Sequence, residues 1–134
     1  GSVHAYLSGL GIEVMASSDN VLRAGLTAKP IDVPEMLACV DYVAAPPIRI
    51  APERISGATE VYYAPVDDFE LGITRVTEPD GEIELPGRGP RVILGVEGTV
   101  TVTIGAVSET LTRGEDSPQP RVSGEGIVAQ ADVP

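Results

Sequence analysis

The sequence predicts an all-β protein, folded as a β-sandwich or a jelly-roll barrel. Fifteen glycines and twelve prolines punctuate the 134 residues, and both residue types mark turns between short strands. With one phenylalanine, four tyrosines and no tryptophan, the core must consist mainly of Val, Ile, Leu and Ala, and the β-branched members of this set favour strands. Segments in which apolar and polar side chains alternate recur at about ten-residue spacing, which is typical of these two architectures.

Two short strands are expected at the start of the chain, at residues 3–8 and 11–16. They are joined through a segment with two glycines, which suits a change of chain direction. Residues 17–20, of sequence SSDN, form a turn cluster.

A single helix is predicted after residue 32. Asp32 can accept a hydrogen bond from the backbone of Glu35, three residues later, and Pro34 is tolerated in a first helical turn. The helix is expected to end near Asp41 and to bury one face, formed by the apolar residues Met36, Leu37 and Val40.

Cys39 lies within this apolar stretch, which indicates a small buried hydrophobic residue rather than a nucleophile. As the only cysteine, it excludes an intrachain disulfide and fits a reducing compartment.

The remainder of the chain is predicted to be a series of strands. Glu97-Gly98 suits the turn of a hairpin, and Pro79-Asp80-Gly81 is a second turn. The strands are expected at Thr59–Ala64, Asp68–Val76, Arg91–Val96, Thr99–Ile104, Val107–Leu111, Arg121–Ser123 and Gly126–Ala131.

The formal net charge of -11 argues against nucleic acid or an anionic membrane surface as a partner, because phosphates attract Lys and Arg. No apolar run approaches the roughly 20 residues that cross a bilayer as a helix, and no signal peptide is recognisable. We therefore expect a cytoplasmic protein without a membrane partner.

His4 and Tyr6 are candidate site residues, because side chains two apart on a strand point to the same side. Imidazole is the commonest metal ligand, and Zn²⁺ is its usual partner. A hydrogen-bonded strand histidine explains the same pattern. His4 is the only histidine and no cysteine lies near it in sequence, so the sequence does not close a zinc site with nitrogen and sulfur ligands alone.

Asp19, Arg23 and Lys29 are charged residues around the following turn. Arg23 could stabilise a developing negative charge while a carboxylate moves protons, and Lys29 could bind a phosphate. A local ion pair or turn cap between Asp19 and Arg23, and a solvated loop lysine, are the alternative interpretations.

Taken together, these residues resemble the signature of type I phosphomannose isomerases. The resemblance rests on the strings HAYLSG at 4–9, EVMASSDNVLRAGLT at 13–27, Lys29 and DVPE at 32–35, in order and spacing. It implies that His4 is a zinc ligand, that Arg23 is catalytic and that Asp19 takes part in ring opening or proton handling. It also implies that Tyr6, Glu13 and Lys29 line a sugar pocket. Later segments, including GPRVILGVEG at 89–98, are similar to the cupin-like barrel at the C-terminus of that family. Between residues 115 and 124 that family carries an apolar strand, whereas this chain has DSPQP at 116–120, so the resemblance implies one missing or irregular barrel strand.

The resemblance implies three regions: terminal strands of a catalytic cupin at 1–27 (a remnant of that domain), a helical connector at 28–47, and a cupin-like jelly-roll at 48–134. The implied reaction interconverts mannose 6-phosphate and fructose 6-phosphate through an enediol(ate). In this family three further zinc ligands, a Gln-x-His pair and a glutamate, come from an upstream N-terminal catalytic half. The isolated chain is therefore expected to be inactive. The alternatives are a non-catalytic cupin-like module that binds carbohydrate or serves a structural role, and a chain that works only with a complementary N-terminal polypeptide.

Overall fold

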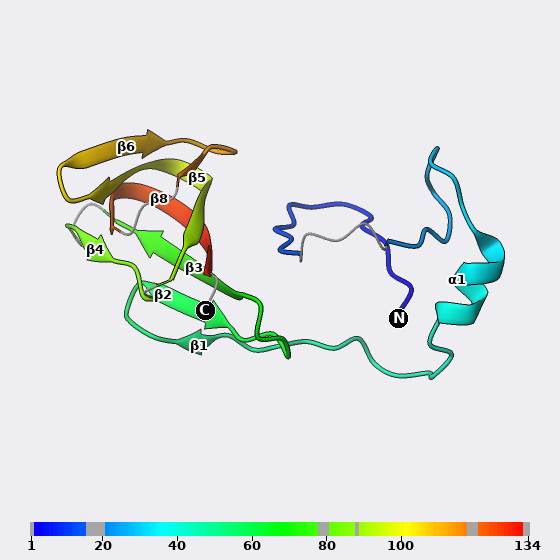
Figure 1. Ribbon diagram of the computed structural model, residues 1–134. Coiled ribbons are helices and arrows are strands. Elements are labelled where there is room, and N and C mark those ends of the chain that lie inside the picture. The colour runs from blue at the N-terminus through cyan, green and yellow to red at the C-terminus, as the bar shows by residue number, and fades with distance from the viewer. Residues whose placement is uncertain (1, 16–20, 78–80, 88, 118–120, 133–134) are drawn as a thin grey trace. The chain divides into compact units, whose positions relative to one another are not determined.

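A computed structural model of the chain covers residues 2–15, 21–77, 81–87, 89–117 and 121–132. The chain divides into two compact units, residues 1–48 and 49–134. The helix α1 (Val33–Cys39) lies in the first unit, and every strand formed by the described residues lies in the second (Figure 1). The predicted all-β class is confirmed, because the described part of the chain is dominated by one antiparallel sheet. Within the covered residues, no helix is long and apolar enough to cross a membrane.

Helix α1 begins where the sequence predicted. The backbone N–H of Glu35 donates to Oδ1 of Asp32 at 3.0 Å, which satisfies one of the unpaired donors of the first turn. At the other end the N–H of Val40 donates to the carbonyl of Met36 at 3.0 Å, so the helix ends two residues before the predicted position. Met36 and Val40 are half-buried, but Leu37 is 51% exposed and does not belong to the covered face.

The predicted strands at 3–8 and 11–16 are not formed, as far as these residues are described (2–15). A strand requires a neighbour for its backbone N–H and C=O groups, and the sheet pairs only strands of the second unit. The apolar side chains that a sheet would cover are exposed instead; Leu7, for example, is 92% exposed. Residue 16 and the predicted turn at 17–20 lie outside the described residues.

The second unit is a curled sheet in which all paired strands are antiparallel and the order is β1-β2-β3-β8-β5-β6, with β4 on β8 and β7 on β5 (Figure 1). Strand β8 is central, because it pairs with both β3 and β5 along most of its length. The strands are β1 (Glu53–Arg54), β2 (Thr59–Tyr62), β3 (Glu70–Val76), β4 (Ile83–Glu84), β5 (Arg91–Ile104), β6 (Val107–Leu111), β7 (Asp116–Ser117) and β8 (Arg121–Asp132).

The predicted hairpin with a turn at Glu97-Gly98 is wrong, because residues 91–104 form one continuous strand. Both halves of β5 pair with β8, and the register shifts between Gly95 and Glu97, which marks a β-bulge. Gly98 has a φ of +74°, a left-handed geometry that glycine adopts without strain. The two predicted strands at the end of the chain likewise merge into the single strand β8, whereas β6 has the predicted bounds.

The bulge also explains how one strand supplies core residues from both of its halves. Buried positions fall on odd numbers before the bulge, as at Ile93, and on even numbers after it, as at Val100. The core is therefore continuous along β5. It consists of Val76, Leu85, Ile93, Val100, Val102, Leu111 and Val128, with Ile83 packed against it.

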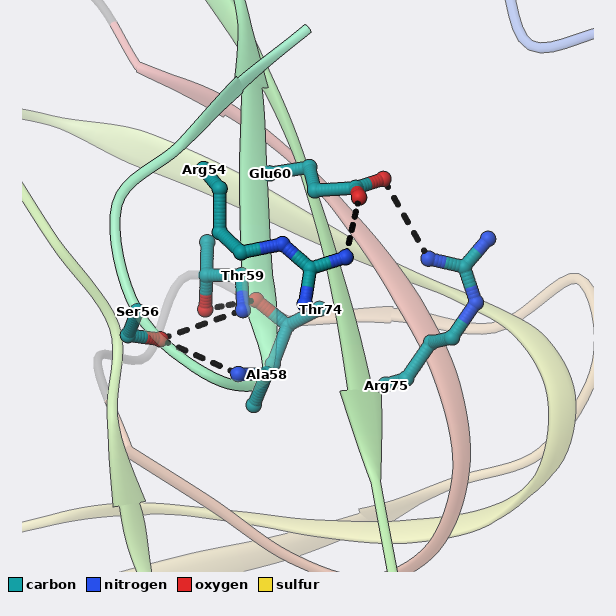
Figure 2. Close-up of polar contacts among 7 residues, drawn as sticks. All are labelled: Arg54, Ser56, Ala58, Thr59, Glu60, Thr74 and Arg75. Carbon is teal, nitrogen blue, oxygen red and sulfur yellow. Dashed lines mark hydrogen bonds and ion pairs between the residues drawn. The ribbon is translucent and has the colours of Figure 1, made fainter.

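The interior of the sheet is not wholly apolar. On β3 the fully buried side chains include Thr74, whereas Leu71 and Ile73 are only half-buried on the other face. Thr74 contacts Thr59 of the neighbouring strand through their hydroxyl groups (Figure 2). Gln130 is also buried, and its side-chain amide donates to the carbonyl of Pro86 at 3.2 Å.

Three charged side chains form a cross-strand network over β1, β2 and β3. The carboxylate of Glu60 receives Nη2 of Arg54 at 3.0 Å on one oxygen and Nη1 of Arg75 at 3.4 Å on the other (Figure 2). Both arginines are more than half exposed, so solvent screens these ion pairs and their contribution to stability is small. Ser56 closes the loop before β2, where its Oγ accepts the N–H of Thr59 at 3.1 Å.

Two predicted irregular segments lie partly outside the described residues. Asp116–Ser117 forms the two-residue strand β7, which pairs with Ile93 and Leu94 of β5, while residues 118–120 are not described. Gly81 of the predicted second turn has a φ of +67°, in keeping with a turn position, and residues 79–80 are not described.

Candidate functional site

The first unit contains an open depression of about 530 Å³. Three segments meet around it: the residues next to His4, the residues next to Arg23, and one face of helix α1. Because Met36 of α1 and Val40, which caps its C-terminal end, are four apart, they lie on the same face and supply part of the apolar lining. The lining residues are Ser2, Val3, His4, Ala5, Tyr6, Val21, Leu22, Arg23, Ala24, Gly25, Met36, Cys39 and Val40.

His4 is exposed at the edge of this depression and has two neighbours in its own segment. Its Nδ1 lies 3.3 Å from the carbonyl oxygen of Ser2. Its ring meets the ring of Tyr6 edge-on, with centroids 6.2 Å apart and planes at 79°, the T-shaped geometry that aromatic rings favour. The imidazole is therefore held by two contacts although it is not buried.

Tyr6 links His4 to Glu13. The phenol O–H of Tyr6 donates to Oε1 of Glu13 at 3.3 Å. These two residues also border a second hollow, of about 520 Å³, together with the intervening residues 7–11. Gly9 allows the chain to reverse there, with a φ of +120°. The predicted pocket residues Tyr6 and Glu13 thus lie in contact.

Arg23 is half-buried and lines the same depression as His4. The backbone after it turns sharply, with φ values of +152° at Gly25 and +55° at Leu26. Leu26 is the non-glycine residue with positive φ among those described, and it is 96% exposed. The structure therefore brings His4, Tyr6 and Arg23 to one surface.

One other predicted site residue, Lys29, does not line this depression. Lys29 is exposed, and its backbone N–H donates to Oγ1 of Thr27 at 3.1 Å, which fixes the loop rather than the ammonium group. Asp19 lies outside the described residues, so its predicted role and its alternative ion pair with Arg23 stay predictions.

Sequence reasoning missed Cys39 as a lining residue and predicted it to be buried; it is exposed. The error arose because the predicted apolar face included positions next to it. Its Sγ–H donates to Oε1 of Glu35 at 3.4 Å, a contact that the four-residue spacing on α1 favours. This hydrogen bond, which requires the protonated thiol, raises the pKa of Cys39, and nearby negative charge on Glu35 acts in the same direction.

His4 fits one position of a zinc site, because a neutral imidazole donates one nitrogen lone pair to a metal. The described residues contain no group of three or more His, Cys, Asp or Glu side chains that could hold a metal ion. A complete tetrahedral site therefore needs donors beyond those that the described residues gather together.

No family model matches the sequence. The chain is similar to the mannose-6-phosphate isomerase of Escherichia coli K12, with 38% identity over 115 residues that cover 85% of this chain and 29% of that protein. It is 51% identical over 72 residues to the enzyme of the same name from Salmonella typhimurium, covering 52% of this chain and 18% of that protein. A crystal structure of Salmonella typhimurium mannose 6-phosphate isomerase bound to substrate (f6p) and zinc is also similar, with a TM-score of 0.74 and 32% identity over 89% of this chain and 32% of that one. The chain thus spans about 30% of the length of the Escherichia coli protein and of the chain in that crystal structure.

Proposed function

Because this chain is homologous to mannose-6-phosphate isomerases along about 85% of its length, we propose that it forms the C-terminal part of such an isomerase. The reaction is the interconversion of mannose 6-phosphate and fructose 6-phosphate. It transfers a proton between C1 and C2 of the open-chain sugar through an enediol(ate), which carries negative charge on its oxygens.

The observation that carries this proposal is that His4 and Arg23 line the same depression. These residues are 19 positions apart in sequence, and the resemblance to phosphomannose isomerases assigns one to the metal and the other to catalysis. A half-buried guanidinium facing a shared hollow can stabilise negative charge more strongly than a fully solvated one. The arrangement is what an enediol(ate) requires.

The remaining site residues are assigned with the same proposal. Tyr6 and Glu13 contact each other beside His4 and can bind sugar hydroxyls, since one donates and the other accepts hydrogen bonds. Lys29 is a candidate for the phosphate group, and Asp19 for ring opening or proton transfer.

Zinc is the cofactor of this proposal, with His4 as one of its ligands. When bound, zinc supplies Lewis-acid stabilisation of negative charge on the sugar oxygens. A single imidazole does not enforce a tetrahedral site, so the other ligands have to come from the part of a full-length isomerase that this chain does not span. The isolated chain is therefore proposed to bind zinc weakly and to lack turnover.

For the second unit we propose a structural role. Its interior is filled by the aliphatic side chains of the core, with Ile93 and Val102 completely buried, and by a few buried polar side chains that include Thr74 and Gln130. That packing disfavours the alternative of a carbohydrate site inside the barrel.

The test is a chimaera in which this chain replaces the matching segment of Escherichia coli mannose-6-phosphate isomerase. We expect the chimaera to bind zinc and to convert mannose 6-phosphate, and the isolated chain to do neither efficiently. A folded, zinc-loaded chimaera without turnover would contradict the proposal, as would tight stoichiometric zinc together with turnover in the isolated chain. The His4→Ala chimaera is the matched control and should lose zinc.

A further inference from the structure

The hydrogen bond of His4 determines which of its nitrogens is available to a ligand. Nδ1 lies 3.3 Å from the carbonyl oxygen of Ser2. A carbonyl oxygen accepts hydrogen bonds and cannot donate them, so Nδ1 must carry the proton in this contact. In the neutral ring, the lone pair then lies on Nε2.

The orientation of the ring is set by a second chain of contacts. The edge-on packing of Tyr6 against His4 limits rotation of the imidazole. Tyr6 is itself held at its far end, where its hydroxyl donates to Oε1 of Glu13 at 3.3 Å. Glu13 thereby acts on His4, nine positions earlier in the sequence, without touching it. Residues 2–15 pair with no strand among the residues that the structure describes. These side-chain contacts are therefore the local means of holding the ring.

We propose that the Ser2 carbonyl, Tyr6 and Glu13 position His4 as its Nδ1–H tautomer and present Nε2 as the metal-accepting nitrogen. Glu13 is thus a positioning residue that acts through Tyr6, in addition to any contact with sugar. The inference rests on the proposed function only in its last step, the binding of a metal at Nε2. The tautomer and the ring orientation exist before any metal binds.

The chain is suited to a direct test because His4 is its only histidine. Long-range ¹⁵N–¹H correlation spectra of the chain at about pH 8.5, where an ordinary imidazole is neutral, report which nitrogen is protonated. Free histidine in water favours the Nε2–H tautomer. We expect the opposite preference in the folded chain, with the Nδ1–H tautomer in the majority. A majority of the Nε2–H form would overturn the proposal.

Variants separate the positioning role of Glu13 from a general effect on folding. In Glu13→Ala and Tyr6→Phe the ring proton shifts of His4 should move towards those of free histidine, since the hydroxyl–carboxylate contact is lost. Glu13→Gln keeps an acceptor oxygen and should restore the original shifts. Tyr42→Phe is the matched control, because the Tyr42 hydroxyl donates to the carbonyl of Leu37 instead. Unchanged His4 shifts in both Glu13→Ala and Tyr6→Phe would refute the role of Glu13.

Addition of Zn²⁺ tests the last step separately. Zinc should shift the ¹⁵N resonance of Nε2 and leave Nδ1 protonated. A zinc-induced loss of the proton on Nδ1 would overturn the proposal that Nε2 is the metal-accepting nitrogen. The expected tautomer without any zinc response at Nε2, in the chain and in the chimaera, would instead refute His4 as a metal ligand and with it the proposed function. In the chimaera, Glu13→Ala should weaken zinc binding about tenfold, and Glu13→Gln should restore it.

Discussion

The hydroxyl oxygens of Thr59 and Thr74 lie 2.9 Å apart, and both side chains are at most 1% exposed. The two residues are directly opposite each other on β2 and β3. Each hydroxyl provides the hydrogen-bond partner that burial removes, so the pair can occupy the interior at little net cost.

Removing one hydroxyl of this pair should destabilise the second unit more than removing both. Thr59→Val or Thr74→Val leaves one buried hydroxyl without its partner, at a cost of about 1–3 kcal/mol in the free energy of unfolding, whereas the double variant should cost much less than the sum. Urea unfolding measures all three. The exposed pair Thr101 and Thr110, with hydroxyls 3.4 Å apart, is the control, and its valine variants should show little coupling. Additive effects at the buried pair would contradict the prediction.

Gly95 should not tolerate alanine, because a Cβ there would overlap the carbonyl oxygen of Thr112. The backbone of Gly95 is also bonded on both sides: its N–H donates to Glu115 and its carbonyl accepts from Gly114, each at 2.8 Å. Neither partner can move without breaking the turn, so Gly95→Ala should lower the free energy of unfolding by about 1–3 kcal/mol or more.

Thermal unfolding provides the measurement for Gly95→Ala. Gly57→Ala is the control, since a Cβ at that position meets nothing within 4 Å. Equal midpoints of thermal unfolding for the two variants would mean that the turn after β6 can move to accommodate a Cβ at Gly95, and would contradict the prediction.

Glu115 should make stability depend on acid pH. The backbone N–H of Thr112 and, next, its hydroxyl donate to the Glu115 carboxylate at 2.7 and 2.9 Å, and they lower the pKa of this group below its ordinary value of 4.5. A folded pKa below the unfolded one stabilises the protein above the unfolded pKa, and this stabilisation is lost as the pH falls through the folded pKa.

The difference in unfolding free energy between the original chain and Glu115→Gln should therefore be largest near neutral pH and vanish in acid. Urea unfolding at several pH values measures it. Glu109→Gln is the control, because Glu109 forms no side-chain hydrogen bond with any described residue. A difference that stays constant with pH would show that the charge of Glu115 is not involved.

The sequence predicted the class of the fold because turn residues and alternation of side chains are local signals. It failed at the bulge of β5, where Glu97-Gly98 is as suitable for a bulge as for a hairpin turn. The choice is made by β8, which pairs with both halves of β5 and is distant in sequence. The change of buried positions from odd to even along residues 93–102 is visible only in the structure. In the sequence, apolar residues stand at even positions on both sides of the bulge, as at Val92, Leu94 and Val100, so no switch is apparent.

The thiol of Cys39 should react readily with an alkylating reagent, since it is exposed. Its pKa is raised mainly by the hydrogen bond to Glu35, so the thiolate that reacts should form only at higher pH than for an ordinary cysteine. Glu35→Ala should shift the pH midpoint of alkylation downwards. No reaction in the folded chain would mean that Cys39 is covered, and an unchanged midpoint would mean that Glu35 does not control it.

The sequence predicted which residues form the candidate site better than it predicted how they are arranged in space. Signature residues such as His4 and Arg23 are recognisable along the chain, but their meeting at one depression depends on the turn at Gly25-Leu26 and on α1. The strands expected around His4 failed because alternation predicts a strand only where a partner strand exists. The exposure of Cys39 likewise depends on what packs against α1, which local spacing does not contain.

Arg23→Ala in the chimaera should lower turnover far more than zinc content. The guanidinium lines the depression, but it cannot bind a cation, so its removal leaves the metal ligands intact while it removes stabilisation of the enediol(ate). A loss of about 10²–10³ in kcat is expected for one charge-stabilising group, with the zinc content per protein, measured by elemental analysis, unchanged.

Arg23→Lys keeps the charge of this residue without the planar guanidinium and should recover only part of the rate. Arg54→Ala, which removes an exposed ion pair of the second unit, is the control and should leave turnover unchanged. Parallel loss of zinc and rate in Arg23→Ala would make Arg23 a structural residue, because a catalytic role alone does not alter metal content.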